Sequence, residues 1–218
     1  MRSTSSGAEV RSGGHPDASC VTVLHMLSIS NDSSSTIGDR ILEAAAYCVV
    51  AYGVDRVTLA EIARRARVSR PTVYRRWPDT RSILAALLTS RIVGVLDEVP
   101  SRGVGREALV ERIVAVAQRL RRDEVVMSVL LKAPDLAMIY IAERLGTSQQ
   151  ILLDAVASDI KLAQEEGSVR TGDQRQLAAM CLLITQSTIQ SGQIVAPILD
   201  ADALDVELAH SLNGYLKP

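Results

Sequence analysis

Between residues 57 and 77, apolar positions recur with the spacing of two short helices. Four of them fall at i, i+3, i+4 and i+7 and mark one apolar face: Leu59, Ile62, Ala63 and Ala66. Farther along, Val73 and Trp77 are four residues apart and share a second face. The segment therefore predicts two short helices joined by a tight turn, with Val73 and Trp77 pointing into the domain.

Helix-start signals precede both apolar faces. Thr58 and Glu61 match a capping box, in which the hydroxyl and the carboxylate each accept a hydrogen bond from an otherwise unpaired backbone amide. Ser69 is placed to cap the second helix, and Pro71 falls in its first turn, where a missing N–H costs little. Two capped helices around a tight turn form a helix-turn-helix, whose second helix enters the major groove of DNA.

The open face of the second helix has the chemistry of a DNA contact. At about 100° per residue, the side chains opposite the buried face and on its flanks are Arg70, Pro71, Thr72, Tyr74, Arg75 and Arg76. Guanidinium groups pair with guanine edges, and hydroxyls bind phosphates. A solvated arginine-rich helix is the alternative, but such surfaces usually include acids. Between Ala63 and Pro78 there are six arginines and no Asp or Glu, which favours DNA binding.

The segment 41–84 resembles the DNA-binding domain of TetR-type (tetracycline-repressor-like) transcriptional regulators. The matching features are Gly53 after the first helix, the Thr58-led helix, Val68-Ser69, Thr72-Val73-Tyr74 and the pair Trp77-Pro78. The resemblance implies a ligand-responsive regulator, most often a repressor, that binds a pseudo-palindromic operator in double-stranded DNA as a homodimer. The direction of regulation stays open.

The chain departs from the family pattern at three places. Arg67 stands in the turn where glycine is common, so a positive φ there is expected to cost strain. Thr80 and Arg81 stand where a phosphate-binding lysine is common, and Val49-Val50 replaces a Leu-Phe pair. Arg67, Thr80 and Arg81 are nevertheless expected to contact DNA. The full set of expected DNA-contacting residues is Thr58, Arg67, Ser69, Arg70, Pro71, Thr72, Tyr74, Arg75, Arg76, Thr80 and Arg81.

The formal net charge of −1 hides a basic segment. From Ile37 to Arg91 there are ten arginines and five acids, a local charge of +5. A locally basic surface is sufficient to bind DNA, so the overall charge does not argue against that function.

The chain reads as all-α, with turn residues between helical patterns and no convincing β alternation. We expect a disordered tail over 1–34, a helix-turn-helix domain over 35–84 whose fourth helix continues to about 98, and a helical effector-binding and dimerisation domain over 99–218. The expected helices are 37–52, 79–98, 105–121, 124–132, 135–145, 148–166, 174–195 and 203–216, besides the two short ones. In the first, Ile41, Ala45, Val49 and Tyr52 are expected to point inward. The tail is either a weak basic arm through Arg2 and Arg11 or dispensable.

The segment Gln174–Val195 is apolar around most of its helical circumference, so we expect it to be buried on more than one side. Together with 148–166 it is suited to a four-helix interface in a homodimer. A central core helix is the alternative.

Adaptable and hydrogen-bonding side chains interrupt the aliphatic stretches of the C-terminal half. They are Met127, Met138, Tyr140, Met180, Gln186 and Gln190. Methionine fits irregular shapes, and an isolated Gln or Tyr orients a ligand. Ordinary core packing explains any one of them. As a set, and given the resemblance, they predict a pocket for a small, neutral or weakly polar apolar effector. A regulator without an effector is the alternative.

The sequence carries no constellation for catalysis, a metal or a cofactor, so we expect none. The three histidines are dispersed, and the acids Asp200, Asp202 and Asp205 lack the rest of a calcium loop and are expected to cap the last helix. Three scattered cysteines and the absence of a long apolar run favour a cytoplasmic protein that does not enter a membrane. A helical interaction protein that does not bind DNA is the remaining alternative.

Overall fold

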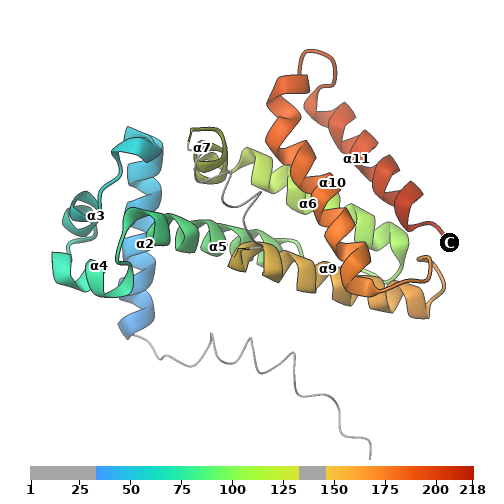
Figure 1. Cartoon of the computed structure of the whole chain (residues 1–218), viewed down its shortest axis with the longest axis horizontal. Helices are drawn as coiled ribbons and strands as arrows, with labels where there is room; N and C mark the ends of the chain where they lie inside the picture. The colour runs from blue at the N-terminus through green and yellow to red at the C-terminus, as the bar shows by residue number, and fades with distance from the viewer. Residues whose placement is uncertain (1–32, 133–145) are drawn as a thin grey trace, which may run out of the picture. The chain divides into compact units, whose positions relative to one another are not determined.

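The computed structural model describes residues 33–132 and 146–218 and shows only helices and turns in these ranges (Figure 1). In chain order they are α2 (Ser33–Tyr52), the 3-10 turn η1 (Val54–Arg56), α3 (Leu59–Ala66), α4 (Arg70–Arg76), α5 (Thr80–Glu98), α6 (Arg106–Arg122), α7 (Glu124–Lys132), α9 (Thr147–Glu165), α10 (Gln174–Val195) and α11 (Ala201–Leu216). The all-α fold is confirmed. The tail up to residue 32 and the expected helix 135–145 lie outside the described residues.

The helix ends agree with the sequence pattern to within a few residues, with one exception. The first helix begins at Ser33, inside the predicted tail, four residues before the expected start. Residues Arg40–Pro218 form one compact unit, apart from Met1–Asp39. The domain boundary expected near residue 99 stays a prediction, because the contacts do not divide this unit there.

The helices around the turn share a small apolar core. Ile41, Ala45 and Val49 of α2 are buried, as expected, and so are Ile62 and Val73. Two aromatic residues depart from the expectation, and in both cases the reason is that a helix ends there.

Tyr52 was predicted to point inward but is largely exposed. It is the last residue of α2, Gly53 turns the chain with a φ of 83°, and the Tyr52 ring lies edge-on to Tyr47 at 6.2 Å. Trp77 is only half-buried, because α4 ends at Arg76 and Trp77 has extended backbone angles that no longer follow the helical period.

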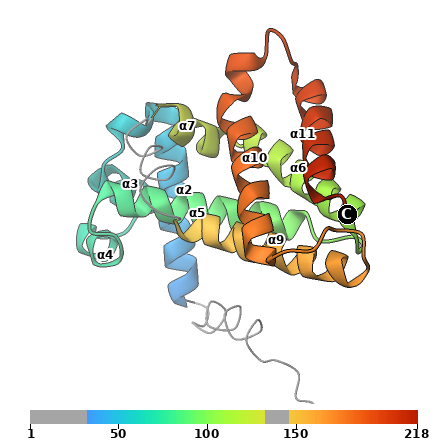
Figure 2. The ribbon, with the colours of Figure 1, turned by 45° about the vertical axis from the view of Figure 1, so that its right-hand side comes forward.

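The helix α5 continues from these elements into the C-terminal helices, where it contacts α6, α7 and α9. The most extensive contact there is between α9 and α10, followed by α6 with α11 and α10 with α11 (Figure 2). The segment Gln174–Val195 is thus packed against three helices of its own chain. Within the described residues, no helix is both long and apolar enough to cross a lipid bilayer.

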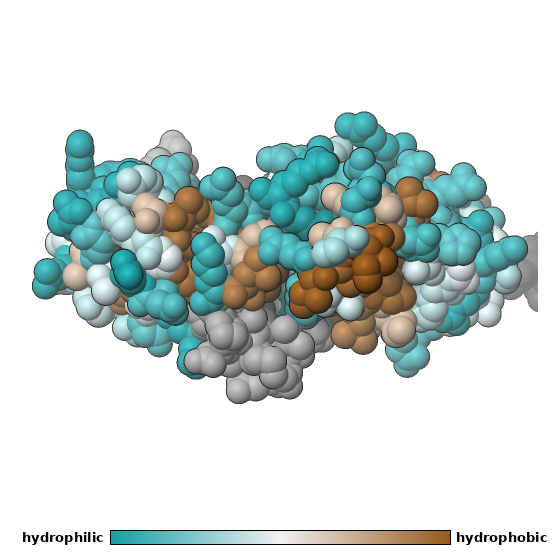
Figure 3. Space-filling view, turned by 90° about the horizontal axis from the view of Figure 1, so that it is seen from above, coloured by the Kyte–Doolittle hydropathy of each residue, from teal (hydrophilic) through white to brown (hydrophobic). Residues whose placement is uncertain are grey.

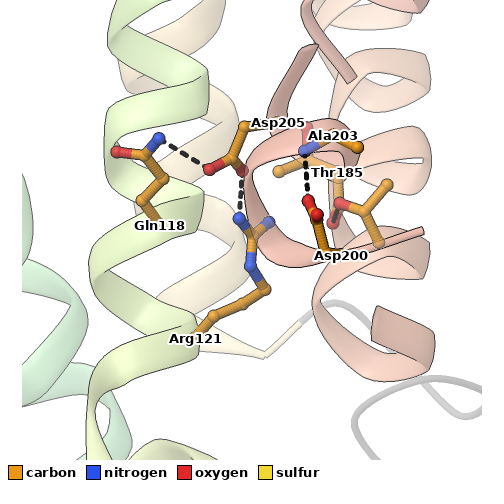
Figure 4. Close-up of polar contacts among 7 residues, drawn as sticks. Gln118, Arg121, Thr185, Asp200, Ala203 and Asp205 are labelled. Atoms are coloured by element: carbon orange, nitrogen blue, oxygen red, sulfur yellow. Dashed lines mark hydrogen bonds and ion pairs between the residues drawn. The ribbon is translucent and has the colours of Figure 1, made fainter. Parts of the chain in front are cut away.

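A polar network joins α6 to α11 (Figure 4). Asp200 caps α11 by accepting a hydrogen bond from the amide of Ala203 at 2.9 Å, as expected. Asp205 was also predicted to cap this helix, but it is buried and accepts hydrogen bonds from Gln118 (2.6 Å) and from Arg121. A carboxylate one turn inside α11 is too far along the helix to cap it, and a charged partner on α6 compensates its burial.

Candidate nucleic-acid interface

The reading helices begin at side-chain caps that hold them in register. The hydroxyl of Thr58 accepts a hydrogen bond from the amide of Glu61 at 3.2 Å, and that of Ser69 accepts one from the amide of Thr72 at 3.3 Å. The hydroxyls of Ser69 and Thr72 are also 2.7 Å apart. These contacts fix the start of α4, the helix expected to enter the major groove.

The reciprocal half of the predicted capping box is wrong. The Glu61 carboxylate does not accept from the Thr58 amide; it receives two hydrogen bonds from Arg64, at 2.9 and 2.5 Å. A paired charged contact with a guanidinium is stronger than one with a neutral amide. These bonds also hold the pKa of Glu61 below its ordinary value.

The turn between the two helices passes through a left-handed residue. Arg67 has φ 55° and ψ 44°, and it is the only described residue other than glycine with a positive φ. The amide of Val68 donates back to the carbonyl of Ala63 at 3.0 Å, which closes α3 with a Schellman-type turn. The positive φ expected at Arg67 is therefore confirmed, and it is this conformation that costs a residue other than glycine strain.

Most of the predicted DNA-contacting residues are open to solvent. Val73 is buried beneath them, while Thr72 and Thr80 are half-buried. The exposed members are Thr58, Arg67, Ser69, Arg70, Pro71, Tyr74, Arg75, Arg76 and Arg81. The helical period thus places the expected side chains outward.

The arginines of this segment fall into two groups. Arg64 is held by Glu61, and the guanidinium of Arg65 lies 2.9 Å from the centre of the Tyr47 ring. Within residues 33–132 and 146–218, no hydrogen bond, ion pair or ring contact engages the guanidinium of Arg67, Arg70 or Arg75, while the charge of Arg81 acts on the nearby Asp79 carboxylate. The second group is therefore available to bind phosphates or base edges, a distinction that the sequence alone does not make.

The start of α5 is a second place where a phosphate contact is expected. The Asp79 carboxylate accepts a 2.6 Å hydrogen bond from the amide of Ser82, and the Ser82 hydroxyl lies 3.4 Å from the Asp79 amide. These bonds lower the pKa of Asp79 and keep the cap ionised. Thr80 and Arg81 occupy the first turn after this cap, where backbone amides and the helix dipole favour a phosphate.

A partly open cavity of about 130 Å³ is lined by residues of α5, α6, α7, α9 and α10. Of the expected effector-contacting residues, Gln186 and Gln190 line it. Met127 is not part of its lining, and Met180 is 42% exposed on α10. Met138 and Tyr140 lie outside the described residues. The sequence did not point to the contribution of α5 and α6, which includes Leu88, Ile92, Arg112 and Val116.

Comparison with known proteins gives one sequence-family match and close relatives. Residues 41–87 match the model of the "Bacterial regulatory proteins, tetR family". An uncharacterized HTH-type transcriptional regulator of Mycobacterium tuberculosis is 66% identical over 191 residues, which cover 88% of this chain and 100% of the relative. A Bacillus subtilis HTH-type regulator, YdeS, is 30% identical over 79% of this chain and 71% of its own length.

Solved structures of similar fold share less sequence. The regulator RolR in complex with resorcinol aligns with a TM-score of 0.61 and 20% identity, over 84% of this chain and 88% of RolR. The transcriptional regulator FadR of Bacillus subtilis, in complex with stearoyl-CoA, aligns with a TM-score of 0.60 and 19% identity, over 81% and 98%. At these identities the likeness concerns the fold.

Proposed function

Because the chain belongs to the tetR family of bacterial regulatory proteins, and is thus a helix-turn-helix DNA-binding transcriptional regulator, we propose that it acts as a ligand-responsive repressor. In this proposal a cytoplasmic homodimer binds a pseudo-palindromic operator and releases it when a small apolar effector fills the cavity. The observation that carries the DNA half is the outward face of α4, whose Arg70 and Arg75 have no partner in the described part of the chain.

Roles for individual DNA contacts follow from their places. Arg70 begins α4, the end of a recognition helix that approaches base edges, so it reads sequence. Tyr74 and Thr72 bind phosphates through their hydroxyls. Arg81, in the first turn of α5, binds phosphate without regard to sequence. The remaining predicted contacts position the helix on the backbone.

Dimerisation is proposed for the outer surface of α10 and α11. Large apolar side chains are exposed there: Met180, Leu183 and Ile194 on α10, Ile198 in the connection, and Val206 on α11. Ile194 and Ile198 are 79% and 92% exposed, and a space-filling view shows apolar residues gathered on the side of the molecule that carries these helices (Figure 3). Exposed apolar surface of this kind is typical of an interface between subunits. This replaces α9 by α11 as the partner of α10 in the expected four-helix interface.

The part of the proposal that concerns the effector rests on the cavity and on α5. Leu88, Ile92 and Leu96 of α5 line the cavity, while the same helix begins with Thr80 and Arg81 beside the reading helices. A ligand that binds only one position of α5 therefore shifts the population toward a dimer whose two α4 helices no longer match successive major grooves. RolR and FadR, which have this fold, were solved with resorcinol and stearoyl-CoA.

Footprinting on the DNA upstream of the gene, with sedimentation of the free protein, tests the proposal. We expect two protected half-sites about 34–36 Å apart or a small multiple of that, and a dimer in solution. A monomer on one unpaired half-site contradicts it. A dimer that binds DNA, but whose affinity for it responds to no small molecule, supports the alternative of a regulator without an effector.

A further inference from the structure

The cavity wall is aliphatic on most of its surface. Branched side chains from α5 and α6, such as Ile92, Leu96, Ile113 and Val116, supply it, and no aromatic side chain of the described residues takes part. Such a wall packs against a flexible hydrocarbon body without stacking. The volume of about 130 Å³ is close to that of an engineered apolar cavity of roughly 150 Å³ that holds benzene. The part of a ligand that lies inside the cavity is therefore small.

Among the described residues, the two charged side chains of the wall neutralise each other. Arg112 donates to the carboxylate of Asp159 at 2.6 Å and, through Nε, to the carbonyl of Val99 at 3.0 Å. Both side chains are more than four-fifths buried, with 18% and 15% exposed. Burial raises the pKa of the remaining ionisable group, the Cys181 thiol, to about 11, so it stays protonated. An ionic ligand would add a third charge with nothing to compensate it.

A chain of amide hydrogen bonds fixes one polar group of the wall. The amide of Gly146 can only donate, and it donates to Oε1 of Gln149 at 2.9 Å. Nε2 of Gln149 is therefore the atom that donates to Oε1 of Gln186 at 3.0 Å. The orientation of both side-chain amides follows from one backbone N–H.

This arrangement leaves a donor for the ligand. Nε2 of Gln186 has no hydrogen-bond partner among residues 33–132 and 146–218, and Gln186 lines the cavity next to Ser148 and Gln190. Because Nε2 of Gln186 is not among the buried atoms that lack a partner, it is accessible, and a ligand carbonyl can accept its hydrogen bond in place of water.

We infer that the effector is a neutral molecule with an aliphatic body and one carbonyl group, as in an amide, ester or lactone, and that its carbonyl oxygen accepts a hydrogen bond from Nε2 of Gln186. This inference rests on the proposed function in that it takes the cavity as the effector site. It narrows the ligand from any small apolar molecule to one of stated charge, shape and polar group.

Three probes of equal chain length test it on the full chain: octanamide, octanoate and octylammonium. Isothermal titration and thermal unfolding measure binding without DNA. We expect octanamide to bind at least 10-fold more tightly than either ion and to raise the Tm the most. Octanoate binding as tightly as octanamide, or no binding of octanamide, overturns the inference.

A variant that introduces a negative charge at position 186 tests the donor role of Gln186. A purely structural role would not change the relative affinities for the amide and the ammonium probe. In Gln186→Glu one carboxylate oxygen still accepts from Gln149, while the other replaces the donor. At pH 8 we expect octanamide to bind about 10-fold more weakly and octylammonium about 10-fold more tightly. The control, Gln176→Glu, changes an exposed glutamine of the same helix outside the lining and should leave the ranking unchanged. An unchanged ranking in folded Gln186→Glu contradicts the inference, and the wild-type series decides if that variant does not fold.

The two proposals fail in different ways. Gel shifts of the wild-type protein on the upstream DNA, with and without octanamide, are measured in parallel. If the protein binds octanamide selectively but its affinity for the operator does not change, the inferred ligand class is supported and the proposed effector role is contradicted. Operator binding that responds to an ionic or aromatic molecule, with no response to octanamide, keeps the proposed function and defeats the ligand class.

Discussion

Arg40 in α2 donates a 2.7 Å hydrogen bond from Nη2 to the carbonyl oxygen of Ala66, the last residue of α3. The last carbonyls of a helix have no partner within it, so this guanidinium satisfies one of them. The contact also ties α2 to the position just before the left-handed turn at Arg67.

Arg40→Ala is expected to destabilise the protein by about 1 kcal/mol, because it leaves that carbonyl with water alone. Denaturant unfolding followed by far-UV circular dichroism measures the change. Arg56→Ala is the control: Arg56 is exposed, and no hydrogen bond or ion pair joins its side chain to another described residue. Equal stability of the two variants would show that the Arg40 contact contributes nothing.

Arg67→Gly is expected to stabilise the fold and weaken DNA binding. Glycine removes the left-handed strain of an L residue, for a net gain of about 0.5–1 kcal/mol after its larger unfolded-state entropy. The loss of one phosphate contact lowers the slope of log K against log salt by about 0.9. Thermal unfolding and salt-dependent gel shifts measure the two effects. Arg67→Lys, which keeps the charge and the strain, should change neither quantity much.

Arg70→Ala and Arg81→Ala are expected to differ in kind. The Arg70 change should cost about 1–3 kcal/mol on the operator and relax the preference at one base pair. The Arg81 change should weaken binding to operator and random DNA alike and lower the salt slope by about one unit. Binding to both DNAs over a range of salt separates these results. A uniform loss for Arg70→Ala would remove it from base reading.

Asp205→Ala is expected to be among the most destabilising single changes, at about 3–5 kcal/mol, because it leaves the Arg121 guanidinium buried without a counter-charge. The two side chains are only 9% and 12% exposed, and Nη1 of Arg121 already lacks a partner in the described part of the chain. Chemical unfolding measures the loss. Asp202→Ala, at an exposed acid of the same helix, should cost well under 1 kcal/mol.

Leu183→Glu is expected to weaken the dimer at least 10-fold, because two-fold symmetry brings the new charge into the interface from both subunits. Sedimentation at several concentrations measures the dissociation constant. Leu162→Glu is the matched control, since Leu162 is also an exposed leucine but lies on α9. If Leu162→Glu dissociates the dimer and Leu183→Glu does not, the interface contains α9, and the proposal for α11 is wrong.

The predictability of each feature follows from the sequence distance over which it forms. The caps at Thr58 and Ser69 and the outward face of α4 depend on residues three or four apart, so the local pattern was sufficient. The aromatic partner of Arg65 lies 18 positions away on another helix, which no local pattern indicates. Glu61 has two possible partners, the Thr58 amide and Arg64, each three residues away, so spacing alone does not decide between them.

The cavity is a harder case, because its wall exists only after five helices pack. Gln149 and Gln186 are 37 positions apart, and Arg112 and Asp159 are 47 apart. The sequence predicts methionines as adaptable parts of the wall, but Met180 faces solvent and the wall consists largely of Leu, Ile and Val. Gln186 and Gln190 stood out in the sequence because polar side chains there interrupt an apolar helix.

In the proposed mechanism, the length of α5 determines how far its DNA-facing end moves when the helix tilts at the cavity. Its 19 residues span roughly 28 Å at about 1.5 Å per residue, with Arg81 at one end and Leu96 at the other. Over such a lever, a tilt on the order of 5° moves the far end by about 2.5 Å, close to the length of a hydrogen bond. In the proposed mechanism, a displacement of α5 too small to disturb packing around a ligand is thus large enough, at the DNA-facing end of the helix, to break phosphate contacts.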